Sequence, residues 1–418
     1  MKKFFRVIGV MLILLCSLAQ PVTAVEYQPE ITIAMDGQFL PTDVPPIIQN
    51  NYTLVPLRTV AEALKLEVSW NAGTQEIQLA GNGVNIMMQI GSNQAVKNGS
   101  RIPLEVSPVI YSNRTMVPVR FVSEALGCHV AWDAAARRVN ISSGPVPMYI
   151  VGYYALGDAA TSSWTDLFSA PYPQSTAGNT YLINELALGW YSMDEQGQLL
   201  TRSDTGWQRP DSWNDVLTAA AGYGLKTQMC VQMTDNNARI RKMMNNIEAR
   251  NLAISSLVAE AAQFDGVNLD FEGLGWNDTP AELSKVRSDY TSFVKDLAVQ
   301  LHSSGKTLTL TLHAPNSAYP GYDYAALGSW ADRIIIMAYD YGPKPEPTDK
   351  VEQAIQLAAA VPADKLLLGI AVANESDASI TAKLNLAIDH NLGGIALWRL
   401  GLVGDGEWKA LGDNIVRK

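Results

Sequence analysis

The chain has 418 residues, of which 47% are hydrophobic and 17% are charged, so it has enough apolar material for more than one packed core. Its 31 Lys and Arg residues against 41 Asp and Glu residues give a formal net charge of −10, and no block of basic residues is present that could follow a phosphate backbone. The composition therefore excludes a wholly disordered chain and argues against nucleic acid as a partner.

Residues 1–24 are typical of a secretory signal peptide. Basic residues at the start precede an apolar run over 7–18 that is too short for an ordinary membrane span, and small residues suit cleavage after Ala24. Cys16 in this run follows a leucine where a lipoprotein signal would have Gly or Ala, which disfavours a lipid anchor. We therefore expect a secreted protein.

Residues 41–70 recur without a gap as residues 103–132, with 15 identities in 30 positions at an offset of 62. Each copy contains a polar turn, a Val-Pro-x-Arg sequence that opens an amphipathic helix, a strand of alternating apolar residues and a second short strand. The repeat predicts a small duplicated α+β domain over 25–143.

This stretch resembles the copper amine oxidase N-terminal-like domain, or stalk domain, of exported proteins from Gram-positive bacteria. The name does not imply copper here, since the repeat holds one histidine, His129, whose counterpart in the first copy is Glu67. We interpret the repeat as a targeting or spacing module, for cell-wall attachment or for self-association. In an alternative interpretation, the repeat carries the function of the protein and the second domain is accessory.

A junction of small residues and prolines over 142–147 is typical of a domain boundary, and about 270 residues follow it, the usual length of a (β/α)8 barrel. We predict a TIM barrel over 144–418, in preference to an open doubly wound sheet, because strand-like runs alternate with helical patterns. The eight runs are 149–155, 181–188, 227–233, 264–272, 306–313, 333–340, 365–372 and 393–399. The placement of the second is the weakest.

Beyond the signal peptide, Cys128 and Cys230 remain, one in each predicted domain, so we expect no disulfide framework. The four histidines are scattered, without the spacing that zinc or copper sites use. We therefore expect no metal and no cofactor.

The run from 264 to 273 carries the most chemical information. Side chains alternate faces along a strand, so Asn268, Asp270 and Glu272 project to one side and apolar residues to the other. A barrel strand is normally buried on both faces, which makes inward acids costly unless they are used. Carboxylates about 7 Å apart can couple, so that one has a raised pKa and acts as a proton donor. A satisfied polar network or a solvated strand end is the alternative.

This segment resembles the Asp-Gly-x-Asp-x-Asp-x-Glu signature of glycoside hydrolase family 18, the chitinase family. Further matches to the family are Gly152-Tyr153-Tyr154 on the first strand, Met337-Ala338-Tyr339-Asp340-Tyr341 on the sixth and Trp398 on the eighth. The resemblance implies a retaining mechanism in which the 2-acetamido group of the substrate is the nucleophile, an exception to the usual scheme of two carboxylates.

The resemblance also implies roles for single residues. Glu272 would protonate the glycosidic oxygen and later activate water. Asp270 would hold the acetamido group, and Tyr339 would donate a hydrogen bond to its carbonyl oxygen. Asp340 would help to hold the distorted sugar above Trp398 as an apolar floor. The remaining substrate contacts would come from Asn268, Tyr153, Tyr154, Met337 and Tyr341. For Trp398 and Tyr153 an ordinary place in the core is the alternative.

Three departures from the family pattern bear on the substrate. Asn268 replaces the middle Asp of the signature, a change frequent in the branch that acts on bacterial cell walls and spore cortex, and it leaves Asp270 without a neighbouring acid. Only about 20 residues separate 369–370 from Gly393, so the insertion that deepens many chitinase grooves is absent and we expect an open cleft. Ala371-Val372-Ala373 replaces an aromatic-rich stretch, which weakens substrate stacking there.

The sequence thus predicts an enzyme that cleaves β-1,4 bonds of glycans containing N-acetylglucosamine, with peptidoglycan or spore cortex as the first substrate and chitin as the second. We expect it at the cell wall or the spore of a Gram-positive bacterium. The alternative from another class is a carbohydrate-binding protein, a lectin on the same fold, and the presence of Glu272 favours the enzyme.

Overall fold

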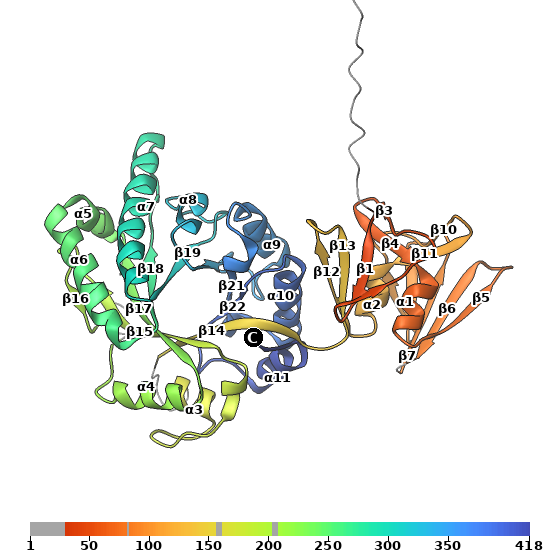
Figure 1. Cartoon of the computed structure of the whole chain (residues 1–418), viewed down its shortest axis with the longest axis horizontal. Helices are drawn as coiled ribbons and strands as arrows, with labels where there is room; N and C mark the ends of the chain where they lie inside the picture. The colour runs from red at the N-terminus through yellow and green to blue at the C-terminus, as the bar shows by residue number, and fades with distance from the viewer. Residues whose placement is uncertain (1–29, 82, 156–160, 203–207) are drawn as a thin grey trace, which may run out of the picture.

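The computed structural model describes residues 30–81, 83–155, 161–202 and 208–418, so the predicted signal peptide over 1–24 lies outside the described residues. An N-terminal module of short strands is followed by a closed barrel of parallel strands, and Figure 1 shows the two side by side. Within the described ranges, no helix combines the length and the hydropathy that a membrane crossing requires.

The N-terminal module has the predicted duplication, because every element of the first copy begins again 62 residues later. The first copy contains β3 (Ile47–Gln49), β4 (Tyr52–Pro56), α1 (Leu57–Ala63), β5 (Glu67–Asn71) and β6 (Glu76–Gly81). The second contains β10 (Val109–Tyr111), β11 (Arg114–Pro118), α2 (Val119–Glu124), β12 (His129–Asp133) and β13 (Arg138–Ser142).

An approximate two-fold axis relates the two copies. Strands β4 and β11 pair antiparallel with Val55 opposite Val117, its own counterpart in the repeat, in a sheet of order β10-β11-β4-β3. Val60 and Val122, at equivalent places in the two helices, are fully buried in the core of the module. Two further sheets are completed by β1 (Thr32–Met35), β2 (Gln38–Leu40), β7 (Val84–Gln89), β8 (Gln94–Lys97) and β9 (Ser100–Pro103).

The C-terminal part is the predicted (β/α)8 barrel, and this fold class is confirmed. Its strands are β14 (Val146–Tyr154), β15 (Glu185–Met193), β17 (Lys226–Thr234), β18 (Gly266–Glu272), β19 (Thr307–His313), β20 (Arg333–Met337), β21 (Leu366–Ala371) and β22 (Gly394–Trp398). Strand β14 closes the barrel, because it pairs in parallel with both β15 and β22. The second strand lies four residues later than predicted, since Gly178–Tyr181 forms a 3-10 turn and the apolar pair at 182–183 packs in the core before the strand begins.

Helices surround the barrel: α3 (Ser163–Phe168), α4 (Trp213–Gly222), α5 (Arg239–Asn245), α6 (Ile247–Glu260), α7 (Pro280–Ser303), α8 (Tyr324–Gly328), α9 (Thr348–Leu357), α10 (Asp377–Asp389) and α11 (Asp405–Asn414). The longest, α7, begins with a capping box in which the Thr279 hydroxyl accepts from the backbone of Glu282 and the Glu282 carboxylate accepts from that of Thr279. Pro280 occupies its first position, where no N–H is needed. The short strands β16 (Leu199–Leu200) and β23 (Ile415–Arg417) extend the sheet.

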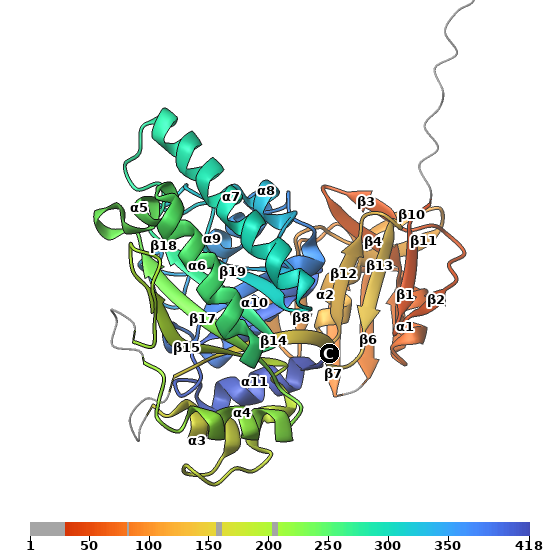
Figure 2. The ribbon, with the colours of Figure 1, turned by 60° about the vertical axis from the view of Figure 1, so that its left-hand side comes forward.

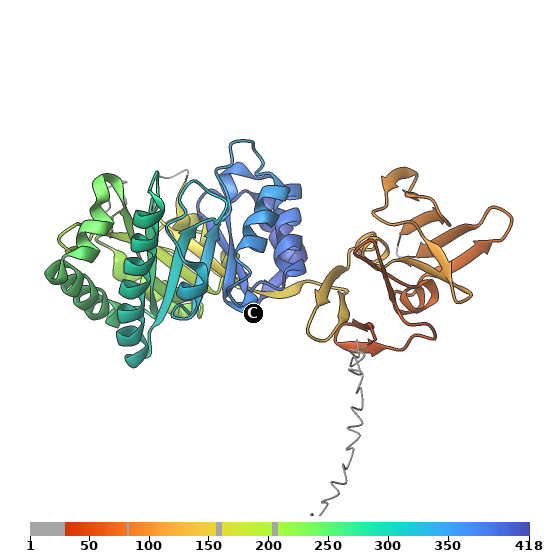
Figure 3. The ribbon, with the colours of Figure 1, turned by 90° about the horizontal axis from the view of Figure 1, so that it is seen from above.

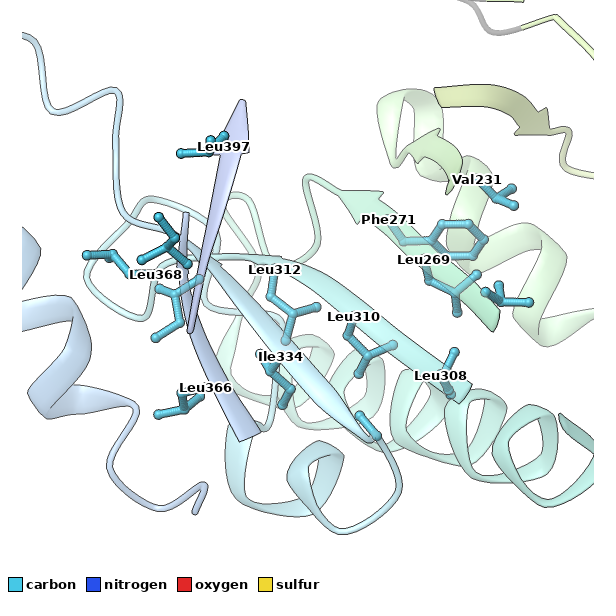
Figure 4. Packing of buried hydrophobic residues seen from close by; sticks show 14 of the residues in the cluster. Val231, Leu269, Phe271, Leu308, Leu310, Leu312, Ile334, Leu366, Leu368 and Leu397 are labelled. Atoms are coloured by element: carbon cyan, nitrogen blue, oxygen red, sulfur yellow. The ribbon is translucent and has the colours of Figure 1, made fainter. Parts of the chain in front are cut away.

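The outward faces of the barrel strands form the main hydrophobic core. Figure 4 shows Leu308, Leu310 and Leu312 of β19 projecting from one side of their strand, and all three are fully buried. The residues between them, Thr309 and Thr311, are buried polar groups on the opposite side. The same alternation separates the packing residues of each strand from those that face the barrel interior.

The module and the barrel touch along β12 and α10, which lie next to each other in Figures 2 and 3. The Asn391 side chain, just after α10, donates a hydrogen bond to the backbone carbonyl of Trp132 over 3.1 Å. Arg120 of α2 forms an ion pair with Asp389, the last residue of α10. The two copies of the repeat therefore have different surroundings, because the second copy supplies these contacts.

Candidate active site

Strand β18 carries a row of polar side chains from the middle of the barrel to its mouth. Asn268 and Asp270 are buried, whereas the Glu272 side chain, at the carboxyl end of the strand, is 29% exposed. The residues between them, Leu269 and Phe271, face the outer core, as Figure 4 shows. This is the arrangement that the alternating sequence predicts.

Asn268 is part of a buried hydrogen-bond network. Its Oδ1 accepts from the Thr311 hydroxyl over 2.8 Å, and its Nδ2 donates to the Tyr153 hydroxyl over 3.5 Å. The hydroxyls of Tyr153 and Thr311 are also hydrogen-bonded to each other. The amide thus connects β14, β18 and β19 one layer below Asp270, and it holds the Tyr153 ring against Trp398, 5.1 Å away in an edge-to-face contact.

Asp270 is the buried member of the carboxyl pair. Its Oδ1 atom has no hydrogen-bond partner among the residues that the structure describes. Burial raises the pKa of Asp270 well above its usual range, and the negative charge of Glu272 raises it further. An unpartnered buried carboxyl oxygen is costly, so Asp270 is poised to accept a hydrogen bond from a ligand.

Glu272 lies between two neutral neighbours. Gln232 Nε2 is 3.5 Å from its Oε1 atom, and His313 Nε2 is 3.5 Å from its Oε2 atom. Burial raises the pKa of Glu272, the contact with Gln232 lowers it and the charge of Asp340 raises it, so that the net change is upward. A raised pKa keeps the proton on the carboxyl group toward neutral pH, which is the property of a general acid.

His313 ends β19 and was not predicted as a site residue. Its ring stacks on Tyr319 with 4.2 Å between ring centroids, and burial lowers its pKa to about 4. The imidazole is therefore neutral at neutral pH, so it does not draw the proton away from Glu272 through an ion pair.

Tyr339 lies just beyond β20, close to the carboxyl pair. Burial raises the pKa of its hydroxyl well above the usual range, and the charges of Asp270 and Glu272 raise it further, so the hydroxyl stays protonated and can donate a hydrogen bond. Gly369 of β21 lies close to this group, since a Cβ atom there would be 2.6 Å from the backbone carbonyl oxygen of Ile336 and 3.3 Å from a ring carbon of Tyr339. Met337, the last residue of β20, is buried beneath this group on the inward side of its strand.

Asp340 follows in a left-handed backbone conformation, with φ +65° and a side chain that is 79% exposed. Its N–H and that of Tyr341 donate to the buried carboxylate of Glu346 over 3.0 and 3.1 Å. Lys344 Nζ lies 3.6 Å from the Asp340 carboxylate. The carboxylate of Glu346 thus fixes the backbone of the loop that presents Asp340.

One predicted contact needs correction. Tyr154 follows Tyr153 on the same strand and so faces outward, where its ring packs edge-on against Trp190 in the outer core, with 6.2 Å between ring centroids. Tyr341 is half-buried in the loop after β20, and its hydroxyl donates to Asn316 over 2.8 Å. Its contact with substrate stays a prediction.

A cleft of about 450 Å³ opens beside Glu272 over the loops that follow β17, β18 and β19. Trp276 and Tyr319 form an aromatic pair in its wall, with 5.4 Å between ring centroids. Arg241 lies at its base, 2.8 Å from carboxylate oxygens of both Asp235 and Asp278. These loop residues gave no periodic signal in the sequence.

Some missed residues did leave a signal. Thr307, Thr309, Thr311 and His313 alternate with leucines along β19, the same pattern that identified the acids of β18. Gln228 and Gln232 likewise occupy inward positions on β17, where Gln228 donates to Thr309 over 2.7 Å. The alternation of polar and apolar residues along β17 and β19, the strands next to β18, would have predicted that these polar side chains face the barrel interior.

Comparisons with known families match both parts of the chain. The family described as "Glycosyl hydrolases family 18" matches residues 150–377, and the "Copper amine oxidase N-terminal domain" matches residues 34–141. The copper of the second name has no ligand set here, because no group of three or more His, Cys, Asp or Glu side chains in the described ranges could hold a metal ion. His129, the histidine of the module, is half-buried and forms a side-chain hydrogen bond with Asn385 of the barrel.

Two relatives come from Bacillus subtilis (strain 168). The "Putative sporulation-specific glycosylase YdhD" is 28% identical over 178 residues, which are 40% of this chain and 39% of that protein. The "Cortical fragment-lytic enzyme" is 23% identical over 253 residues, which are 43% of this chain and 57% of that protein. The chain thus spans between about two fifths and three fifths of the length of these relatives.

Two solved structures share the barrel fold. A chitinase from Chromobacterium violaceum ATCC 12472 has a TM-score of 0.52 at 22% identity, over 63% of this chain and 98% of its own. The spore cortex-lytic enzyme SleL of Bacillus megaterium QM B1551 has a TM-score of 0.53 at 18% identity, over 66% of this chain and 75% of its own. At these identities the likeness concerns the fold alone.

Proposed function

We propose that this chain, which belongs to glycosyl hydrolases family 18 and is a glycosidase, cleaves β-1,4 bonds next to N-acetylglucosamine with retention of configuration. The observation that carries the proposal is the pair of Asp270 and Glu272 at the carboxyl end of one barrel strand, the place where TIM-barrel enzymes have their active sites. Asp270 is buried, with one carboxyl oxygen that has no hydrogen-bond partner in the described part of the chain, and Glu272 opens to a cleft.

Glu272 acts first as the general acid. Its raised pKa keeps the proton available, and the cleft beside it receives the leaving sugar. As the glycosidic bond breaks, the carbonyl oxygen of the substrate's own acetamido group attacks the anomeric carbon and forms an oxazolinium ion. Glu272, now a carboxylate, then takes a proton from the water that opens this ring, and the configuration is retained.

Asp270 and Tyr339 stabilise the intermediate. The Oδ1 atom of Asp270 accepts the acetamido N–H, and this hydrogen bond stabilises the positive charge that develops on the ring. Tyr339 stays protonated and donates to the acetamido oxygen. Trp398, held edge-on by Tyr153, forms the floor beneath the sugar, and Asp340 contacts it from the loop after β20.

We propose peptidoglycan or spore cortex as the first substrate and chitin as the second. Asn268 supports this order, because it replaces the middle acid of the signature. An acid at this position could share a proton with Asp270, whereas the neutral amide of Asn268 forms hydrogen bonds with Thr311 and Tyr153. The names of the two relatives, one sporulation-specific and one cortex-lytic, point in the same direction. A non-catalytic lectin is the second candidate, and the proton on Glu272 argues against it.

We further propose that residues 1–24 are a signal peptide, that 25–143 and 144–418 are separate domains, and that the protein is secreted to the cell wall or spore surface of a Gram-positive bacterium. The basic start and short apolar run support export. The end of β13 at Ser142 and the start of β14 at Val146 support the domain boundary.

The test is product analysis. The chain from residue 25 onward is incubated separately with peptidoglycan, spore cortex and chitin oligomers, and the released reducing ends are identified by mass. We expect N-acetylglucosamine at the new reducing ends, with cortex or peptidoglycan cleaved faster than chitin. Binding to all three without cleavage would support the lectin, and faster cleavage of chitin would reverse the order of substrates. The Glu272→Gln variant is the control for contaminating activity.

A further inference from the structure

The duplicated module preserves residues that its core does not need. Among the 15 identities between the copies, Val55/Val117 and Val60/Val122 are buried and so are explained by packing. Some of the others have local explanations, since Asn51 and Asn113 lie in left-handed turns and Arg58 and Arg120 pair with glutamates of their own helices. These explanations do not account for the exposed tryptophan. In the first copy, Trp70 is 43% exposed and the Arg58 side chain is 84% exposed.

These exposed identities line two equivalent clefts. Cleft 1, of about 490 Å³, is lined by Arg58, Val68 and Trp70 of the first copy together with Ile110, Asn113 and Thr115 of the second. Cleft 2, of about 430 Å³, is lined by the counterparts of these six residues: Arg120, Val130, Trp132, Ile48, Asn51 and Thr53. Each cleft therefore joins both copies, and the two-fold axis exchanges one cleft for the other.

In cleft 2 the arginine has two carboxylate partners. Arg120 forms ion pairs with Glu124 of its own helix, 3.3 Å away, and with Asp389 at the end of α10, a carboxylate that comes from the barrel. The Arg120 side chain is 34% exposed, and the neighbouring Trp132 is half-buried and accepts a hydrogen bond from Asn391 through its carbonyl. The guanidinium of this cleft is thus paired with a carboxylate from another domain.

Cleft 1 is lined by the same residue types as cleft 2, but its arginine pairs with a carboxylate of its own helix. The ion pair of Arg58 is with Glu62 at 4.0 Å, between two exposed side chains, and such pairs contribute little. Beside it, Val68, Trp70 and Ile110 offer an exposed apolar surface. A cationic group next to an indole face fits a ligand with a carboxylate and a flat apolar face. On a chain with a net charge of −10, this is a local site for an anion.

We propose that cleft 1 binds a glycan strand whose amino sugars carry carboxylates. Trp70 stacks on the apolar face of a sugar ring, Arg58 pairs with its carboxylate, and Asn113 and Thr115 contact its hydroxyls. The carboxylate follows from the equivalent pair of Arg120 and Asp389, and the choice of a glycan over an acidic peptide rests on the proposed function of the barrel. A second attachment to the same polymer raises the effective concentration of the barrel at its substrate.

The test uses the mature chain with Glu272→Gln, so that the polymer stays intact while binding is measured by sedimentation with purified peptidoglycan sacculi. Trp70→Ala, which loses the stacking contact, and Arg58→Ala, which loses one charge-assisted contact, should each weaken binding about tenfold. Arg101→Ala, which removes an exposed arginine outside both clefts, should have no effect. Unchanged binding by both cleft variants would overturn the proposal. Arg58→Ala protects against a folding artefact at Trp70, because Arg58 is almost fully exposed.

Three further arms identify the ligand. Sacculi with amidated carboxylates, and chitin, which has none, should bind the parent and Arg58→Ala chains alike, and a persistent difference between these two chains would overturn the carboxylate assignment. Glycan strands stripped of their stem peptides should still distinguish the variants; a need for the peptides would replace the glycan by an acidic peptide. Turnover of soluble oligosaccharides, measured with Glu272 intact, should be unaffected by Trp70→Ala. Failure of the barrel's proposed function would abolish that turnover but not the difference in binding.

Discussion

Replacement of Glu272 by Gln removes the transferable proton and preserves the volume of the side chain. General acid catalysis contributes about 10²–10⁴-fold, which is about 3–5 kcal/mol of barrier. The surroundings of Glu272 favour the upper half of this range, because neither neighbour can replace the acid. Gln232 has no acidic proton, and His313, with a pKa of about 4, carries no extra proton at neutral pH. We therefore expect kcat to fall about 10³-fold or more.

The assay compares two leaving groups on the same sugar. A natural oligosaccharide needs a proton from Glu272 to release the alcohol, whereas a dinitrophenyl glycoside departs without one. The Glu272→Gln variant should lose most of its activity on the first substrate and little on the second. Glu248→Gln, which changes an exposed carboxyl at the start of α6, is the matched control. An equal loss on both substrates would mean that the residue supports the fold of the site and does not donate the proton.

Four further predictions follow from the same geometry. A glycan that is de-N-acetylated at the sugar preceding the scissile bond should not be cleaved, because the nucleophile is missing; equal turnover of both forms, measured by product mass, would point to an enzymic nucleophile. Tyr339→Phe should lower kcat about 10²-fold with little change in KM, since it removes one donor to the acetamido oxygen, and steady-state kinetics check this. His313 has a folded pKa of about 4 against 6.5 for the free side chain, so the unfolded chain binds more protons between these pH values. The free energy of unfolding should therefore rise with pH across this window by up to about 3 kcal/mol, and thermal unfolding of His313→Gln should show a flatter profile. Arg120→Ala should speed amide hydrogen exchange in β12 and α10, because Asp389 loses its partner, while turnover of soluble oligosaccharides stays unchanged.

The barrel and the position of Asp270 and Glu272 could be predicted because strand geometry has a period of two residues. Apolar residues such as Leu269 and Phe271 pack outward, so the polar residues between them must face the interior. The same rule shows why Tyr153 and Tyr154 cannot both reach the substrate, although a motif that spans both residues suggests it. Strand geometry therefore predicts the direction of these two side chains better than membership of the motif does.

The loops beyond the strands could not be predicted in this way. Asp340 occupies a left-handed conformation that depends on the buried carboxylate of Glu346, six residues later. Trp276 and Tyr319, 43 positions apart in the chain, meet in the cleft from different loops. Such contacts depend on tertiary packing, and neither periodicity nor spacing in one sequence records them.

The equivalent strands β5 and β12 show how the two copies of the module came to differ. Val68 and Trp70 on β5 line cleft 1, and the same residue types line cleft 2 from β12. The positions that alternate with them have changed: Glu67 and Ser69 of β5 are exposed, whereas His129 and Ala131 of β12 lie against α10 of the barrel. Because alternate residues face opposite sides of a strand, the face toward the barrel could change without altering the cleft. Contact with the barrel therefore explains the differences between the copies, and the binding role that we propose for the clefts accounts for the exposed Trp70, which lies outside the hydrophobic core of the module.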